Sequence, residues 1–417
     1  MEKQLKPAIR FKGFTDPWEQ RKVGDITIES TEYLTLDSGL PLFTSSRNGL
    51  MYQNEYRGNV TTDSKQTLFS VVPLGACTYR HMSDDDVFHL NINTIEKGLV
   101  SREYPVFCGT QNHDIVFIVQ YINSSKAFRA FCAEQKMGGT RTRLYYKALC
   151  EFTMMVPRFA EQRRISKFLL TFDHLITLHQ RKYDKLQVIK KAMLEKMFPP
   201  NGSNVPEIRF RGFTDPWEQR KFDEVFDCTV PNNTLSRAEL SYDEGTVLNV
   251  HYGDVLIKYG SVLDVQKDDI PRIPYRCRED FNGALLQDGD VIIADTAEDE
   301  TTGKACEIGN LQGRAIVSGL HTMVCRPRHR MALGYLGHYL NSNAYHHQLL
   351  PLMQGIKVLS LSRSNIQKTS VSYPTVEKEQ QLIANYFSQL DNLITLHQRE
   401  LEKLQKIKKA MLEKMFV

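Results

Sequence analysis

Two stretches of the chain carry hydrophobic residues at helical spacing. They run from about residue 161 to residue 198 and from about residue 379 to residue 416, and neither contains proline or glycine. Apolar steps of three and four over roughly five heptads predict two long α-helices, each with an apolar seam that needs a partner. The simplest partner for one seam is the other. The seam residues expected to contact the other helix or another subunit are Phe172, Leu175, Ile176, His179 and Leu186 in the first helix, and Leu390, Leu393, Ile394, His397 and Leu404 in the second.

The chain is an internal repeat whose two halves share their ends but not their interiors. Two like halves in one chain should pack about a pseudo-two-fold axis, which would run the two helical seams antiparallel. The interiors, residues 23–156 and 222–373, look almost unrelated. The repeated segments are residues 7–22 and 206–221, here called the lead segments, residues 175–181 and 393–399, and residues 190–198 and 408–416.

The repeat predicts an α+β protein with two globular α/β domains separated by two long, antiparallel, coiled-coil-like helices. The link Pro199–Pro206 holds turn-forming residues and should end the first helix sharply. The expected segments are a first domain with its lead segment at residues 1–157, a first long helix at 158–200, a second domain with the repeated lead segment at 201–374, and a second long helix at 375–417.

Short apolar runs between turn-forming residues indicate mixed α/β structure in both interiors. In each lead segment, the Asp-Pro pair (Asp16-Pro17 and Asp215-Pro216) predicts a short helix start, with Asp as cap and Pro in the first turn. Trp18 and Trp217, the only tryptophans, are expected to anchor the core. Strands are expected over residues 67–72, 114–119, 253–258, 289–294 and 315–318, and helices over residues 121–132 and 333–350.

Composition and charge narrow the class of protein only a little. The hydrophobic share of 41% and the charged share of 24% are ordinary for a globular protein, and the net charge of +4 does not by itself indicate nucleic acid. Eight scattered cysteines, none in a C-x-x-C pair, are typical of reduced thiols. No signal-peptide pattern and no run of about 18 apolar residues is present, which favours an intracellular protein.

No sequence motif indicates catalysis by this chain alone. A phosphate-binding loop of the Walker type is missing, because Gly303-Lys304 lacks the upstream glycine. Glu134-Gln-Lys136 has a nuclease-like spacing without the upstream Pro-Asp, and Pro199-Pro200 lies in the wrong order for a DNA amino-methyltransferase. The acidic run Glu298–Glu300 is better explained as a solvated loop than as a metal site, because metal ligands must converge. We therefore predict no catalytic residue, bound cofactor or metal in this chain.

Basic and amide side chains in predicted loops suggest a DNA-reading surface in each interior. Arg and Lys can bond to guanine or to phosphate, while Asn can bridge adenine. In both interiors a glycine, Gly139 or Gly355, precedes a basic residue, Arg141 or Lys357, by two positions. The candidate DNA contacts are Arg47, Asn48, Arg80, Arg141 and Arg143 in the first interior, and Lys258, Tyr259, Lys304, Arg314, Lys357 and Arg363 in the second.

The length of the helices fits this interpretation. A helix of about 38 residues spans about 57 Å, which equals about 17 base pairs of duplex. Two domains held by such helices could each reach a major groove, roughly one helical turn apart. Because the two interiors differ, the site would be asymmetric.

The whole chain resembles the specificity subunit of type I restriction–modification enzymes. The resemblance is carried by the two lead segments, by the paired Leu-Ile-Thr-Leu-His-Gln-Arg runs, and by the Pro and Glu-Gln residues where the helices start, Pro157 with Glu161-Gln162 and Pro374 with Glu379-Gln380. It implies two target recognition domains that each read one half of a bipartite double-stranded DNA site, with the helices as spacer.

The resemblance also implies partners that supply the chemistry. Two modification subunits would bring S-adenosylmethionine and methylate adenine, and restriction subunits would use ATP and Mg to translocate and cut, in a bacterial cytoplasm. The helices, including residues 175–181 and 393–399, would dock the modification subunits. The main alternative is an interaction scaffold, two globular modules on a coiled coil, that binds no nucleic acid.

Overall fold

The computed structural model describes residues 6–57, 66–136, 140–200 and 202–416 and divides the chain into two compact units. The first unit comprises residues 1–179 and 400–417, and the second comprises residues 180–399. Each unit therefore combines one globular interior with the first half of one long helix and the final part of the other. Gly139, expected before Arg141, lies outside the described residues.

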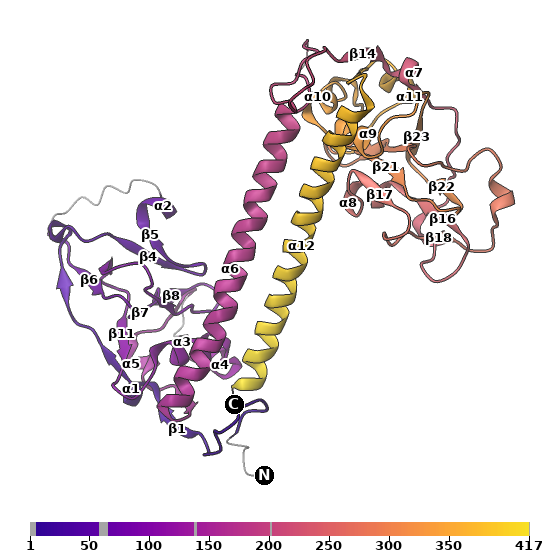
Figure 1. Ribbon diagram of the computed structural model, residues 1–417. Coiled ribbons are helices and arrows are strands. Elements are labelled where there is room, and N and C mark those ends of the chain that lie inside the picture. The colour runs from indigo at the N-terminus through magenta and orange to yellow at the C-terminus, as the bar shows by residue number, and fades with distance from the viewer. Residues whose placement is uncertain (1–5, 58–65, 137–139, 201, 417) are drawn as a thin grey trace. The chain divides into compact units, whose positions relative to one another are not determined.

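The two long helices form as the apolar spacing predicts. They are α6 (Phe159–Lys196) and α12 (Glu377–Met415), drawn in magenta and yellow in Figure 1. Within the second unit, Lys190 of α6 bonds Asp391 of α12 at 2.5 Å, and Phe198 stacks on Phe387 with ring centroids 5.6 Å apart. Higher residue numbers on α6 thus face lower numbers on α12, so the helices run antiparallel.

The first unit repeats these contacts at equivalent positions. Asp173 of α6 pairs with Lys408 of α12, and each lies 218 positions from its counterpart in the Asp391–Lys190 pair. Phe168 of α6 and Met411 of α12 pack against one core cluster. The internal repeat of the sequence therefore gives equivalent contacts between the helices in the two units.

The first unit builds its interior from short strands and short helices. A four-stranded sheet in the order β2-β11-β7-β9 and a three-stranded sheet in the order β10-β6-β3 form its centre, beside the β4-β5 hairpin. Its elements are β1 (Glu19–Lys22), α1 (Val23–Ile26), β2 (Thr27–Glu29), β3 (Tyr33–Leu34), η1 (Leu36–Ser38), β4 (Phe43–Ser46), β5 (Gly49–Tyr52), α2 (Gln53–Arg57), β6 (Phe69–Val72), β7 (Cys77–Thr78), β8 (Met82–Ser83), β9 (Asn91–Ile92), β10 (Gly98–Ser101), β11 (Val106–Gly109), α3 (Ile115–Ser124), α4 (Lys126–Glu134), β12 (Thr142–Arg143), α5 (Tyr146–Leu149) and β13 (Thr153–Val156).

The second unit has a larger central sheet of five strands in the order β15-β23-β19-β21-β17, beside a three-stranded sheet in the order β18-β16-β22. Strands β16 and β22 run parallel, as do β17 and β21. Its elements are β14 (Glu218–Lys221), α7 (Phe222–Val225), β15 (Phe226–Asp227), η2 (Arg237–Glu239), β16 (Val247–Val250), α8 (Tyr252–Ile257), β17 (Val262–Asp264), β18 (Arg272–Ile273), η3 (Arg278–Phe281), β19 (Val291–Ala294), β20 (Thr296–Ala297), β21 (Ala305–Gly309), β22 (Ile316–Ser318), β23 (Thr322–Pro327), α9 (Tyr335–Leu340), α10 (Asn343–His346), η4 (Leu350–Leu352), β24 (Leu359–Ser360), α11 (Arg363–Ile366) and β25 (Ser370–Tyr373).

The lead segments tie each interior to its helix by the same three kinds of contact. Their strands β1 and β14 pair antiparallel with β13 and β25, the strands that lead into α6 and α12. Arg10 donates from Nε and Nη2 to both carboxylate oxygens of Glu161 at 2.6 Å, and Arg209 holds Glu379 in the same way at 2.7 and 2.9 Å. The tryptophan of each lead segment is buried in its core cluster, as predicted.

The predicted short helix at Asp16-Pro17 is wrong. Residues 15–18 are irregular, and the next element is the strand β1, because the Glu19–Lys22 backbone bonds to β13. The same correction holds at Asp215-Pro216, where β14 follows. A pairing with a segment more than 130 residues away in sequence outweighs the local helix-start signal.

Two predicted strands are helices instead. The segment predicted as a strand over 114–119 begins α3, where Asp114 caps the helix by accepting from the N–H of Val116 at 2.8 Å. The segment 253–258 belongs to α8, capped by the side chain of His251. Short continuous apolar runs do not separate strand from helix by periodicity, which explains both errors.

The remaining interior predictions hold in part. Strands β6, β19 and β22 form within 67–72, 289–294 and 315–318. The helix predicted over 121–132 is broken at Ser125, which caps α4, and the one over 333–350 is broken between α9 and α10. Within the described part of the chain, no helix combines the length and the hydrophobicity that crossing a lipid bilayer requires.

Candidate nucleic-acid interface

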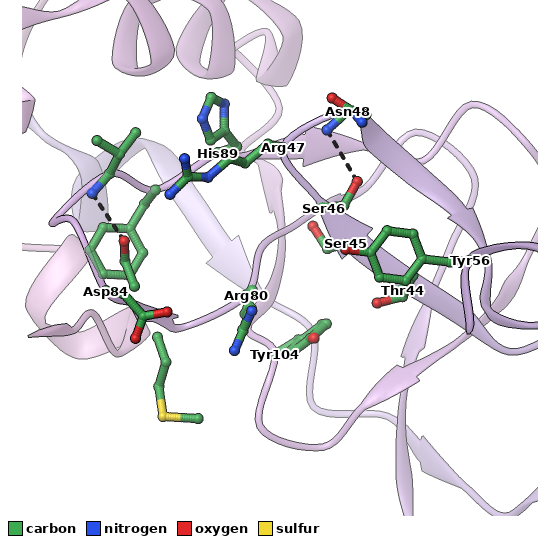
Figure 2. A pocket seen from close by; sticks show the side chains of 14 residues that line it. Thr44, Ser45, Ser46, Arg47, Asn48, Tyr56, Arg80, Asp84, His89 and Tyr104 are labelled. Carbon is green, nitrogen blue, oxygen red and sulfur yellow. Dashed lines mark hydrogen bonds between the residues drawn. The ribbon is translucent and has the colours of Figure 1, made fainter. Parts of the chain in front are cut away.

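A polar pocket in the first unit brings together three of the predicted DNA contacts. It has a volume of about 330 Å³, and Arg47, Asn48 and Arg80 line it (Figure 2). Tyr56 and Tyr104 add aromatic rings to its lining. Donors, an amide and aromatic rings on one concave surface are the groups that proteins use to contact nucleic acid.

The β4-β5 hairpin places Arg47 and Asn48 at the tip of a tight turn. Gly49 takes a φ of +117°, a conformation that glycine adopts without strain, and so lets the chain reverse directly after Asn48. The Ser46 hydroxyl donates to the Gly49 carbonyl at 3.0 Å and accepts from the Asn48 N–H at 3.1 Å. These bonds stiffen the tip, so both side chains extend from a well-defined support.

A second segment brings the other predicted side chains of this interior to the same region. Arg80 follows β7 closely, and β8 after it pairs with β12, setting Arg143 opposite Met82. The N–H of Leu144 also donates to the His81 carbonyl at 2.8 Å. Arg141 and Arg143 therefore lie beside the strand that lines the pocket.

Carboxylates hold two of these arginines. Arg47 Nη2 lies 2.5 Å from Asp85 Oδ1, and Arg141 Nε lies 2.7 Å from Asp84 Oδ1. The Ser83 hydroxyl donates to Asp85 at 2.8 Å, and this bond together with Arg47 lowers the pKa of the Asp85 carboxyl. The Asp85 carboxylate is therefore charged at neutral pH and pairs with Arg47.

His89 lines the same pocket as a neutral side chain. Burial lowers the pKa of its imidazole, and the nearby positive charge of Arg47 lowers it further. An imidazole whose pKa lies below the usual value of about 6.5 is uncharged at pH 7. It offers one donor and one acceptor to a ligand, and sequence reasoning missed it together with Asp84 and Asp85.

The second unit does not gather its predicted residues in this way. Lys357 and Arg363 are exposed, on the segment around β24 and at the first position of α11. Lys258 is exposed at the end of α8, where its Nζ donates to Asp269 Oδ2 at 2.9 Å. Arg314 is exposed, but its Nη1 donates to the Val265 carbonyl at 3.0 Å.

Two predicted contacts of the second interior are not surface groups. The ring of Tyr259 is 3% exposed and belongs to a core cluster, because the turn after α8 folds back onto the sheet. Lys304 is half-buried, and its Nζ donates to the Leu256 carbonyl at 2.8 Å. Burial lowers the pKa of Lys304. The buried ring of Tyr259 cannot meet a duplex without rearrangement, so this assignment is wrong. The assignment of Lys304 stays a prediction.

A cluster around Tyr242 contains residues that the sequence analysis missed. Arg237 and Lys258 lie over the Tyr242 ring at 5.2 and 4.7 Å from its centroid. Arg237 also bonds Asp254 at 2.6 Å. No spacing signal marks this group, because its members are joined by cation–π contacts between separate turns.

The segments around Arg141 and Lys357 occupy corresponding places in the two units. Leu361 donates its N–H to the Asp295 carbonyl at 2.8 Å, as Leu144 does to His81. When these two leucines are aligned, Arg141 corresponds to Val358. The glycine spacing instead matches Arg141 with Lys357, which is one position earlier. The tip of the second segment carries Ile356, which is fully exposed.

The family of the chain follows from its match to a model of known sequences. The model of the type I restriction modification DNA specificity domain matches residues 95–188 and 214–406. The chain belongs to this family. Each matched region of this specificity subunit joins a large part of one interior to most of one long helix.

Known proteins agree with this assignment. The chain is similar to the type I restriction enzyme MjaVIII specificity subunit of Methanocaldococcus jannaschii, with 22% identity over 312 residues that cover 72% of this chain and 70% of that one. Its fold is similar to the crystal structure of the type-I restriction-modification system S subunit from M. genitalium, with a TM-score of 0.61, 12% identity and 99% of each chain covered. The latter likeness concerns the fold alone.

The seam residues of this specificity subunit take different positions on the helices. Leu390 and Ile394 are buried, and Leu393 is 44% exposed. The other predicted seam residues lie on both helices and are Phe172, Leu175, Ile176, His179, Leu186, His397 and Leu404.

Within the described residues, no group of three His, Cys, Asp or Glu side chains could hold a metal ion.

Proposed function

We propose that this specificity subunit reads an asymmetric, bipartite DNA site, with one half-sequence per unit. The observation that carries the proposal is the first-unit pocket, in which Arg47, Asn48 and Arg80 converge beside Arg141. Side chains from two stretches far apart in sequence form one basic and amide surface there. The second unit has a different interior, which supports a different half-sequence and hence an asymmetric site.

The long helices would act as the spacer between the half-sequences. Two equivalent ion pairs, Asp173–Lys408 and Lys190–Asp391, join the helices, and the arginine forks on Glu161 and Glu379 give both interiors the same kind of attachment. Long helices that attach to both interiors in the same way support the proposal of a set separation between the half-sequences.

The modification subunits would dock on the exposed face of the helices. Leu178 and Leu396, which are equivalent in the repeat, are 39% and 52% exposed, and Leu393 lies nearby on α12. Exposed leucines at repeated positions support two like docking surfaces, and therefore two copies of one partner. S-adenosylmethionine, ATP and Mg would be bound by the modification and restriction subunits, and this chain would contribute no catalytic residue.

The test is selection of DNA by the assembled complex. We expect the chain with its modification subunits to select, from a randomised duplex library, two unlike half-sequences at a fixed separation. Methylated adenines mapped in host DNA should mark the same site. Binding should weaken with salt, because phosphate contacts release counterions. A palindromic site, or binding without sequence preference, would contradict the proposal; no DNA binding at all would favour the interaction scaffold.

A further inference from the structure

The arginines around the first-unit pocket are of two kinds. Arg47 and Arg141 are each bonded to a carboxylate, Asp85 and Asp84 respectively. Arg80 is exposed and lines the same pocket, and among the residues that the structure describes it has no carboxylate partner. Because a neighbouring carboxylate changes what a guanidinium can bind, the two kinds should contact different parts of a duplex.

Each ion pair leaves hydrogen-bonding groups available to a ligand. Arg141 uses its Nε for Asp84, and these side chains are 55% and 69% exposed. Arg47 uses Nη2 for Asp85, and these are 61% and 47% exposed. A guanidinium has five N–H donors and a carboxylate about four acceptor sites, so each pair presents donors and acceptors side by side.

That arrangement matches a G·C base pair and mismatches a phosphate. In the major groove, guanine offers the N7 and O6 acceptors, which arginine contacts, and the paired cytosine offers an N4 amine, from which aspartate accepts. A phosphate offers acceptors only, and its charge is repelled by the carboxylate beside the arginine. A lone arginine such as Arg80 suffers no such repulsion.

Asp85 and its neighbour Asp86 are held on the protein side as well. The Ser83 hydroxyl fixes Asp85, and the Thr142 hydroxyl of β12 bonds Asp86, the next residue in the run. The Thr142 bond thus attaches the acidic run to the segment that carries Arg141, while Ser83 holds Asp85 from within the loop of the run itself. A positioned partner restricts the arginine side chain before DNA arrives, which favours directional contacts over diffuse attraction.

We propose that the Arg141–Asp84 and Arg47–Asp85 pairs are the base readers of the first unit, each recognising one G·C base pair, and that Arg80 contacts phosphate. Asp84 and Asp85 are specificity-determining residues: they accept from cytosine and orient their arginines. The half-site of the first unit then contains two G·C base pairs. This inference rests on the proposed function and names the bases that this part of the site recognises.

The experiment compares variants of the full chain, each assembled with the modification subunits, on the selected DNA site. Asp84→Asn and Arg141→Ala should each lose discrimination at one and the same G·C position, by roughly tenfold. The variant that combines both substitutions should lose no more discrimination than the single variant with the larger loss. Arg80→Ala should weaken binding to all sequences equally and reduce the slope of log K against log salt by about 0.9.

Glu151→Gln serves as the matched control, because Glu151 forms an exposed ion pair with Lys22 away from the pocket residues. It should leave discrimination and salt dependence unchanged. The half-site read by the second unit should be unaffected in every variant, which provides an internal reference. Asp85→Asn tests the second pair independently and should relax a different G·C position.

Two results would overturn the inference while leaving the proposed function intact. One is a bipartite site without G·C pairs in the half-site that depends on the first unit. The other is unchanged discrimination in Asp84→Asn and Asp85→Asn, which would reduce both pairs to surface salt bridges. If the wild-type complex selected no sequence at all, the proposed function itself would fail.

Discussion

His338 is a buried histidine that has no hydrogen bond from either ring nitrogen within the described part of the chain. It packs against Phe387, and burial with the nearby charge of Lys190 lowers its pKa to about 3. Asp391 lies 4.0 Å from its Nδ1 but is bonded to Lys190, so it does not hold a proton on the ring. Folding therefore requires a neutral imidazole at this position.

The consequence is a pH dependence of stability with a definite sign. The pKa of His338 in the folded protein lies below the unfolded value of about 6.5. The contribution of the neutral ring to stability is therefore complete above pH 6.5 and is lost as the pH falls toward 3. Between pH 7 and pH 5 this group should remove about 2 kcal/mol of the free energy of unfolding. His338→Leu should lose that part of the pH dependence, as measured by urea unfolding at both pH values. Parallel curves for variant and wild type would contradict this assignment.

At the same scale, Lys357 is expected to read the second half-site. It is exposed beside the fully exposed Ile356, on a segment where Gly355 has a φ of +123°. Lys357→Ala should weaken the half-site of the second unit by roughly tenfold and leave the first unchanged, in competition binding of the assembled complex. Lys378→Ala, an exposed lysine of α12, is the control. A uniform loss over all sequences would make Lys357 a phosphate contact.

At the scale of elements, the arginine forks should stabilise the two interiors separately. Glu161 and Glu379 are 1% and 0% exposed, and each accepts two bonds from its arginine. Replacing the glutamate leaves a partly buried guanidinium without its charge partner, which costs about 3 kcal/mol. Glu161→Gln should therefore lower the unfolding midpoint of the first unit.

Glu379→Gln should cause a similar loss in the second unit, and thermal unfolding followed by hydrogen exchange in each unit can separate them. Glu151→Gln, which removes the exposed pair with Lys22, should leave the stability nearly unchanged. Equal effects of the buried and exposed variants would show that the forks do not stabilise the lead segments.

At the scale of the whole molecule, the helices should set the separation of the half-sites. Inserting four residues after Arg181 and four after Arg399 lengthens both helices at equivalent points of the repeat. Four helical residues add about 6 Å, or about two base pairs. The methylated sites should show a longer spacer and unchanged half-sequences. An unchanged spacer would refute the role of the helices as a ruler.

By itself the sequence determined the parts of this protein whose signals are local or repeated. Apolar spacing predicted α6 and α12, because helical periodicity is a property of consecutive residues. The repeat predicted their antiparallel pairing, since like ends need like contacts, and the family followed from the same segments. The prediction failed first where short apolar runs, such as residues 114–119 and 253–258, fit helix and strand equally well.

Only the tertiary structure decided which predicted side chains share a surface. Arg47, Arg80 and Arg141 come from separate segments of the chain. Strand pairing brings Arg141 beside the segment of Arg80, and bonds from the Asn91 amide to Ser45 and Ser46 hold the Arg47 hairpin at the same pocket. The same folding buries Tyr259 and gives Arg47 and Arg141 their carboxylate partners. Exposure and charge pairing depend on residues distant in sequence, so no local pattern predicts them. The helices and the repeated segments, by contrast, can be recognised from the order of consecutive residues.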